Sequence, residues 1–228
     1  PGGYFSPWEE GYNLPEVKDN KHISDVITDE ALKFIDNNSD NPFFLNLWFY
    51  DVHAPFQSKK KLIEKYRKKI KSNDFEYQNC PTMAAMIEVM DYNIGRILDK
   101  LDNLGLTDDT IIVFLGDNGG NMYSEINGTS PTNNFPLKGG KATIYEGGIR
   151  VPMIVKWPGT VNEDTISNEV VVGPDIYPTL INMAGLEMPD TQKFDGNNII
   201  PALKGGEIDR EAIFMHFPHY MKATGNKP

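Results

Sequence analysis

Apolar residues recur at helical spacing in three parts of the chain, and this spacing predicts amphipathic helices. The first pattern covers about residues 23–36 and stops at the polar sequence DNNSDNP, which breaks a helix. The second runs over residues 83–101, is rich in methionine, isoleucine and leucine, and is expected to end near Gly105. The third covers residues 175–183 and is expected to stop at Gly185.

Between these helices, short apolar runs predict strands. Residues 43–50, FFLNLWFY, are almost continuously apolar, as in strands of parallel sheets that are covered on both faces. Residues 110–115 and 151–157 predict two further strands, the latter with Pro152 at a sheet edge or at its first residue, and 212–217 is a candidate final strand. Strands alternating with helices predict an α/β fold with a mostly parallel sheet covered by helices.

Composition limits the partners of this 228-residue chain. Its formal net charge of −10 argues against nucleic acid and against an anionic membrane surface as partners. No apolar run approaches the roughly 20 residues that a membrane-spanning helix requires. An anionic substrate would therefore have to be attracted by local cations against an unfavourable overall field.

Two polar features near the predicted helices have plain structural interpretations. The lysine-rich residues 59–71 are interpreted as the solvated face of a helix rather than as an anion-binding patch, because positive charges in such a run point in many directions. His22 is interpreted as a solvated residue at the start of the first helix.

Residues that could bind a ligand or take part in catalysis come directly after two of the predicted strands. In open α/β sheets, ligands bind beyond the carboxyl ends of the strands. The run 43–50 ends just before the sequence DVHAP, which contains His53, and the run 110–115 ends just before Asp117 and Asn118. If the two strands are parallel neighbours, these three side chains converge on one crevice.

The residue types at these positions suit a metal and an oxyanion. Asp117 and Asn118 offer the oxygen ligands that calcium and magnesium prefer, although Asp-Asn-Gly is also ordinary turn chemistry. Lys138 and Lys141 flank two glycines, and a lysine in such a turn can reach an anion closely. The alternative is that both lysines, and a loop histidine such as His53, simply face solvent or backbone.

Several segments, in this order along the chain, resemble the sulfatase family, specifically its arylsulfatase A-like branch in the alkaline phosphatase superfamily. They include YFSPWEEGYNLPEV, DYNIGRILDKLDNLGLTDDTIIVF, the sequence GDNGG and GGKATIYEGGIRVP. The resemblance implies that residues 1–228 are part of an alkaline-phosphatase-like sulfatase domain. It implies a partial catalytic domain, truncated on its N-terminal side and before its C-terminal subdomain is complete.

The resemblance also implies roles for the candidate residues. Asp117 and Asn118 match calcium ligands of the family, His53 matches the histidine that contacts the sulfate and serves the leaving oxygen, and Lys141 matches the lysine that grips the sulfate oxygens. Lys138 stands where the family often has arginine and is the second candidate for substrate binding. The family nucleophile is a formylglycine made within C-x-P-x-R, and the single cysteine, Cys80, lies in CPTMA instead.

The implied function is hydrolysis of sulfate esters, on a carbohydrate or aryl sulfate, with calcium and with a formylglycine that lies outside this chain. Two alternatives stay open: a phosphoric or phosphonic ester hydrolase of the same superfamily, and a non-catalytic protein that binds sulfated glycans. The resemblance implies a periplasmic, secreted or lysosomal location. The 228-residue chain alone is expected to be inactive and to bind calcium weakly, because the nucleophile and most calcium ligands are missing from it.

Overall fold

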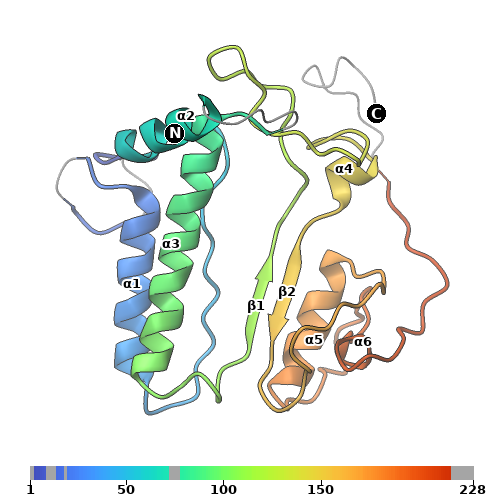
Figure 1. Ribbon diagram of the computed structural model, residues 1–228. Helices are drawn as coiled ribbons and strands as arrows, with labels where there is room; N and C mark the ends of the chain where they lie inside the picture. Colours follow the sequence, from blue (N-terminus) through green and yellow to red (C-terminus); the bar gives the residue numbers. More distant parts are fainter. Residues whose placement is uncertain (1–2, 9–13, 18–19, 72–77, 217–228) are drawn as a thin grey trace. The chain divides into compact units, whose positions relative to one another are not determined.

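A computed structural model describes residues 3–8, 14–17, 20–71 and 78–216. The chain divides into two units (Figure 1). The first holds residues 1–107, 117–151 and 218–228, and the second holds residues 108–116 and 152–217. In the described part of the chain, no helix is both long enough and apolar enough to cross a bilayer.

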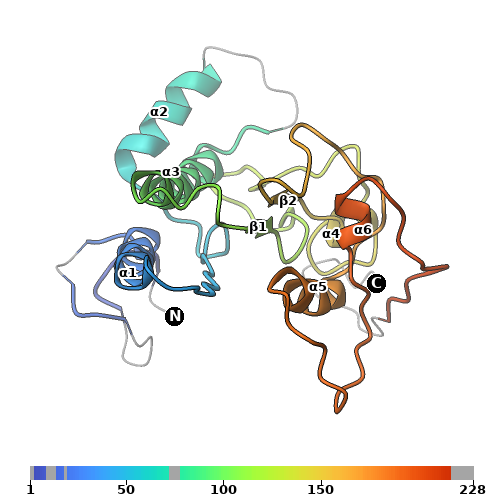
Figure 2. The same ribbon diagram turned by 90° about the horizontal axis from the view of Figure 1, so that it is seen from below.

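Two long helices form the centre of the first unit. α1 (Ile23–Asn38) and α3 (Pro81–Asn103) realise the two helical patterns of the sequence and lie side by side (Figures 1 and 2). Each buries an apolar stripe, which includes Val26 and Ile35 on α1 and Met86 and Val89 on α3. The methionine row of α3 is therefore core packing at this end of the helix. Cys80 is the buried N-cap residue of α3, as its place before Pro81 suggests.

Polar pairs fix how α1 and α3 are aligned. In ascending order along both helices, the pairs are Asp25 with Asn93, Asp29 with Arg96 and Asp36 with Lys100. Because both partners advance together, the two helices run in the same direction. Parallel neighbouring helices need a long return connection, which residues 39–80 supply.

α2 (Lys60–Lys71) lies within this return connection. It crosses the N-terminal end of α3 (Figures 1 and 2) and has no buried residue. Lys65 joins it to Glu88 of α3 with a nitrogen–oxygen distance of 2.7 Å. The prediction that residues 59–71 form a solvated helix is confirmed.

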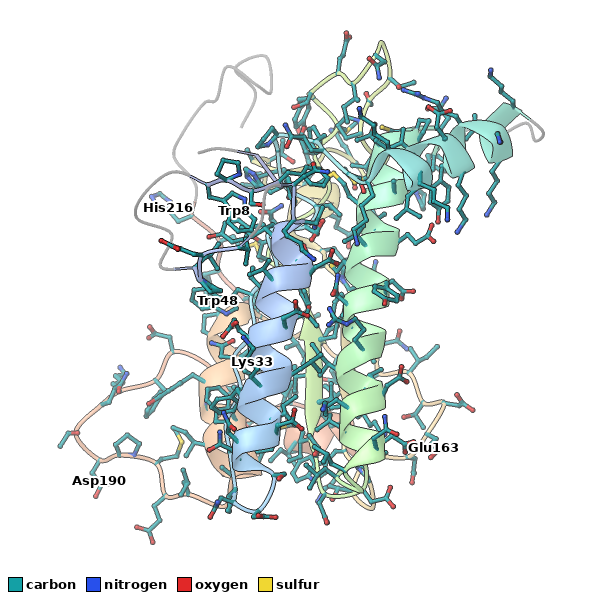
Figure 3. The ribbon with its side chains drawn as sticks, turned by 90° about the vertical axis from the view of Figure 1, so that its left-hand side faces the viewer. Trp8, Lys33, Trp48, Glu163, Asp190 and His216 are labelled. Atoms are coloured by element: carbon teal, nitrogen blue, oxygen red, sulfur yellow. The ribbon has the colours of Figure 1, made fainter. Side chains whose placement is uncertain are left out.

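The predicted strand at residues 43–50 is wrong for the described chain. The segment runs extended beside the helices without strand pairing, and its side chains alternate between half-buried and exposed. Phe44 is 70% exposed and Trp48 is 78% exposed, with Trp48 on the outside in Figure 3. A strand requires hydrogen-bonding neighbours along its edges, and an apolar run cannot supply these by itself.

The second unit contains the only strands among the described residues. β1 (Ile112–Leu115) and β2 (Met153–Lys156) lie where two apolar runs predict them, and Pro152 directly precedes β2. They pair antiparallel, with Ile112 opposite Lys156, which differs from the parallel pairing expected of sequential strands. Residues 212–216 are not a strand, and Phe217 lies outside the described residues.

Short helices complete the second unit. A 3-10 turn, η1 (Gly173–Asp175), leads into α5 (Ile176–Met183), and α6 (Ile200–Leu203) follows. α5 ends before Gly185, whose φ of +68° is the left-handed conformation that favours glycine at a helix end.

A buried carboxylate anchors these helices. Asp175 is fully buried and accepts hydrogen bonds from the backbone N–H groups of Val172 and Asn197, each at 2.8 Å. It also forms a two-pronged ion pair with Arg210. Burial alone raises the pKa of a carboxyl group, but these donors outweigh it and lower the pKa of Asp175. Asp175 therefore holds three segments of this unit together.

Candidate functional site

Two glycine-rich loops of the first unit interlock. The backbone N–H of Gly119 donates to the carbonyl of Gly148 at 2.9 Å, and the N–H of Lys141 donates to the carbonyl of Gly120 at 3.0 Å. A Cβ atom on Gly119 would lie 1.9 Å from the carbonyl oxygen of Gly147, so no side chain fits there. Glycine is therefore required for this close approach, which brings residues 117–120 against residues 138–148.

Asn134 braces the same two loops. Its amide nitrogen donates to the carbonyls of Gly120 and Gly139, at 3.0 Å in both cases. Nothing in the spacing of the sequence marks Asn134, because its partners are backbone atoms that only the fold brings together. It is a positioning residue that sequence analysis missed.

Asp117 and Asn118 present oxygen atoms at the start of the first loop. The Asn118 amide nitrogen donates to the Gly119 carbonyl at 2.9 Å, which leaves its side-chain oxygen as an acceptor. The Asp117 carboxylate is exposed and, within the described chain, has no hydrogen-bonding or ion-pairing partner. A free carboxylate beside an amide oxygen fits part of a calcium shell. No group of three or more histidine, cysteine, aspartate and glutamate residues that could hold a metal occurs among the described residues.

The two lysines of the second loop differ in their surroundings. Lys138 is exposed, and its ammonium group lies 4.0 Å from the ring centre of Tyr145. This cation–π contact stabilises the lysine charge at a position on the Tyr145 ring. Lys141 is half-buried, and its backbone is tied to Gly120. The structure therefore places Lys141 beside the Asp117 loop with an ammonium group that no described residue pairs.

α4 (Glu146–Ile149) follows these lysines and closes the loop. Glu146 and Arg150 form an ion pair at 3.8 Å, with both side chains about two-thirds exposed. An exposed pair at this distance contributes little stability. The backbone bonds between the loops hold the arrangement instead.

His53 lies in an exposed turn whose backbone is held by hydrogen bonds from a buried tyrosine, Tyr4. Its Nδ1 lies 2.7 Å from the carbonyl oxygen of Ala54, which can only accept, so Nδ1 carries the proton in this contact. Nε2 is then the nitrogen that can exchange a proton with a ligand. The phenol oxygen of Tyr4 lies 2.5 Å from the Tyr50 carbonyl and 2.8 Å from the His53 carbonyl.

Tyr4 is thus a clamp across the turn at residues 50–53. It is 3% exposed, and burial raises the pKa of its phenol, with the Asp51 carboxylate adding to the effect. The phenol is therefore protonated and a donor throughout the neutral range. The sequence does not mark this role, because Tyr4 is 49 positions from His53 and no local pattern links them.

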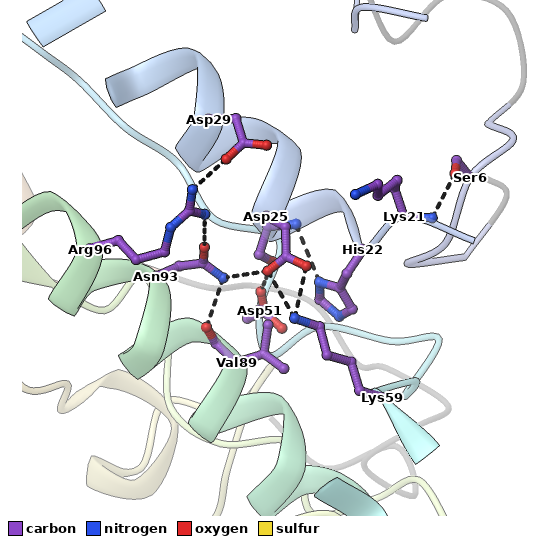
Figure 4. A network of polar contacts seen from close by, with 11 residues as sticks. Ser6, Lys21, His22, Asp25, Asp29, Asp51, Lys59, Val89, Asn93 and Arg96 are labelled. Carbon is purple, nitrogen blue, oxygen red and sulfur yellow. Dashed lines mark hydrogen bonds and ion pairs between the residues drawn. The ribbon is translucent and has the colours of Figure 1, made fainter. Parts of the chain in front are cut away.

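A partly buried polar cluster supports the same turn from the side of α1 (Figure 4). Asp25 is paired with Lys59 at 2.8 Å and accepts a hydrogen bond from Asn93 at 3.0 Å. The hydroxyl of Ser24 donates to the Asp51 carboxylate. Burial raises the pKa of Asp51 to about 6, although the Ser24 hydrogen bond acts in the opposite direction.

The interpretation of His22 as a solvated residue is wrong. His22 is 1% exposed, and its ring packs against the rings of Tyr4 and Phe5. Its Nδ1 accepts from the backbone N–H of Ser24 at 3.3 Å, which makes it the N-cap of α1. Burial lowers the pKa of His22 to about 4, with Asp25 opposing the shift. Aromatic neighbours from the N-terminal segment exclude water here, and no local pattern marks them as neighbours of His22.

The structure therefore brings together four of the five predicted site residues. Asp117, Asn118, Lys138 and Lys141 lie on two interlocked loops, and His53 lies on a clamped turn of the same unit. No hydrogen bond among the described residues joins His53 to these loops, so its convergence with them stays a prediction. The site therefore consists of a loop with oxygen ligands held against a loop with a cation that is unpaired among the described residues.

Comparisons with known proteins identify the family. The family model described as Sulfatase matches residues 3–186. A sulfatase of Formosa agariphila is 35% identical over 217 residues, covering 88% of this chain and 38% of the relative. Human steryl-sulfatase is 33% identical, covering 89% of this chain and 33% of the relative. The chain therefore belongs to the sulfatase family.

A solved structure agrees with this assignment. The crystal structure of Ps i-CgsB in complex with k-i-k-neocarrahexaose is 34% identical, with a TM-score of 0.72, and the match covers 86% of this chain and 41% of that one. The α/β fold class is thereby confirmed. The chain spans between 33% and 38% of the length of three curated relatives.

Proposed function

We propose that the protein containing this chain hydrolyses sulfate esters of carbohydrates. The observation that carries the proposal is the interlocking of the Asp117–Gly120 loop with the loop that carries Lys141. This contact brings the loop that offers oxygen ligands against the loop that carries an unpaired cation, which supports binding of a sulfate group together with a divalent metal. The oligosaccharide named in the related crystal structure, k-i-k-neocarrahexaose, supports a carbohydrate as the alcohol part.

In this proposal each residue has a separate task. Asp117 and Asn118 would hold calcium together with further ligands, and the ion would supply positive charge against the sulfate oxygens. Lys141 donates hydrogen bonds to the same oxygens, and its charge counts most where negative charge develops. His53 gives a proton to the leaving alcohol through Nε2, since Nδ1 is occupied by Ala54.

The nucleophile must come from outside these 228 residues. Cys80 cannot supply it, because it lies in CPTMA and is buried at the start of α3. The proposal assigns this task to the formylglycine of the family. In the proposal, the residues of this chain bind and orient the sulfate group and protonate the leaving alcohol.

The test uses the full-length protein and two substrates that differ in one atom type, an aryl sulfate and the matching aryl phosphate. We expect hydrolysis of the sulfate with a much higher kcat/KM than of the phosphate, and loss of that activity in His53→Ala. His216→Ala is a matched control, because His216 is an exposed histidine of the other unit. A preference for the phosphate would favour the phosphoric ester alternative, and saturable binding of sulfated sugars without turnover would favour a binding protein.

A further inference from the structure

α2 separates its apolar and cationic residues by face. At 3.6 residues per turn, Leu62, Ile63, Tyr66 and Ile70 fall on one side, and all four are half-buried, as expected for the side that contacts α3. Five cations fall within a sector of about 120° on the other side. They are Lys60, Lys61, Arg67, Lys68 and Lys71, and all are exposed.

Ion pairs distinguish lysines that hold this helix from lysines that do not. Lys59 is paired with Asp25 of α1, and Lys65 with Glu88 of α3, so both fasten the helix to its neighbours. Arg67 is paired with Glu64, the one acidic residue of α2. Within the described residues, Lys60, Lys61, Lys68 and Lys71 have no ion-pair partner. Lys65 and Lys69 point to other sides of the helix, but four lysines without an ion-pair partner in the described part of the chain gather on this one face.

The position of this face relates it to the candidate site. Lys60 lies only seven positions after His53, so their Cα atoms lie within about 25 Å of each other. Both belong to the same unit. Lys59, in the segment between them, forms an ion pair with Asp25 of the polar cluster that supports the His53 turn. A chain of several sugar units with one sulfate at His53 would be long enough to reach α2.

We propose that this face of α2 binds the flanking sulfate groups of a polymeric sulfated polysaccharide whose reacting sulfate lies at the His53 site. This inference rests on the proposed function. In a chain of net charge −10, a polyanion is attracted only where cations are concentrated, and this face is such a place. An interfacial membrane helix would need a free apolar side, and the apolar side of α2 is turned to α3.

Two variants of the full-length enzyme with the same change in net charge test the proposal. The first changes Lys60, Lys61, Lys68 and Lys71 to glutamine. The control changes four exposed lysines away from α2 to glutamine, namely Lys21, Lys33, Lys156 and Lys193. Far-UV circular dichroism establishes that each variant is folded. Binding of a sulfated polysaccharide, its desulfated form, DNA and phosphatidylserine vesicles is then titrated at several salt concentrations.

We expect the α2 variant to bind the sulfated polysaccharide about tenfold more weakly at low salt, since each exposed cation contributes roughly a factor of two. Its salt dependence should flatten, and the control should behave like the wild type. Hydrolysis of a small aryl sulfate should be unchanged in the α2 variant, which separates this inference from the proposed function. If no sulfate ester is hydrolysed at all, the proposed function fails while the binding result is still measured.

Three results would overturn the inference. The α2 variant could bind the sulfated polysaccharide as tightly as the wild type. Both variants could lose affinity equally, which would reduce the effect to net charge. The wild type could bind DNA or anionic vesicles at least as tightly as the sulfated polysaccharide, in a way that the α2 variant abolishes, which would assign the face to another partner.

Discussion

Replacing Tyr4 by phenylalanine removes one oxygen atom and tests whether the His53 turn is clamped. The ring and its packing against His22 stay, and only the hydroxyl that contacts the carbonyls of Tyr50 and His53 is lost. The Tyr50 carbonyl keeps a donor, because the backbone N–H of His53 lies 2.9 Å from it. The His53 carbonyl keeps no other donor among the described residues.

The expected cost follows from this count. The hydrogen bond from Tyr4 to the His53 carbonyl is partly buried and His53 itself is exposed, so we expect Tyr4→Phe to lower the free energy of unfolding by about 1 kcal/mol. The turn should also move relative to the rest of the site. A displacement of about 1 Å can cost roughly a hundredfold in rate, and we expect kcat/KM for a sulfate ester to fall at least tenfold.

Urea unfolding and steady-state kinetics of the full-length protein measure both effects, with kinetics below the unfolding transition. Tyr177→Phe is the matched control, since Tyr177 is exposed and stacks on Phe194 in the other unit. Equal stability and equal kcat/KM in the two variants would refute the clamp. A loss of stability with unchanged kcat/KM would show that Tyr4 supports the fold without positioning His53.

Three further predictions concern pH, the lysines and the metal. Burial lowers the pKa of His22 from 6.5 to about 4, so protonation of this histidine in the unfolded chain should lower the free energy of unfolding by about 2 kcal/mol between pH 7 and pH 5. Burial raises the pKa of Asp51 from 3.8 to about 6, so protonation of this carboxylate in the folded chain should restore about 1 kcal/mol over the same range. Urea unfolding at both pH values should therefore show that Asp51→Asn loses more stability between pH 7 and pH 5 than the wild type, and that His22→Asn loses less. Identical pH profiles of stability in all three proteins would contradict both assignments. Lys141→Ala should reduce kcat/KM by a factor of about 10²–10³. Lys138→Ala should change kcat/KM less than about threefold, because the Lys138 ammonium group is in a cation–π contact with Tyr145. Equal losses in the two variants would contradict the proposed role of Lys141. Calorimetry on the 228-residue chain should find calcium binding no tighter than about 10⁻⁴–10⁻³ M and none in Asp117→Ala, and tight binding that survives this substitution would place the calcium elsewhere.

The hydrophobic patterns of this chain were sufficient for α1, α3 and α5 and for the two described strands, whereas the short helices α4 and α6 were not predicted. The repeats at residues 23–36 and 83–101 predicted α1 and α3, because an amphipathic helix is specified by residues within a few turns of one another. The apolar run at residues 43–50 failed as a strand, because strand formation depends on neighbours that the run does not contain. The family, too, was recognisable from ordered local segments.

What only the tertiary structure decided is which distant groups hold the site. Residue types and glycine spacing marked Asp117, Asn118 and Lys141, whereas Asn134 and Tyr4 act on backbone carbonyls and leave no pattern in the sequence. His22 shows the same limit, because aromatic side chains from another segment bury it and lower its pKa. Local order follows from neighbours along the chain, but burial and backbone hydrogen bonds depend on which remote segments the fold brings into contact.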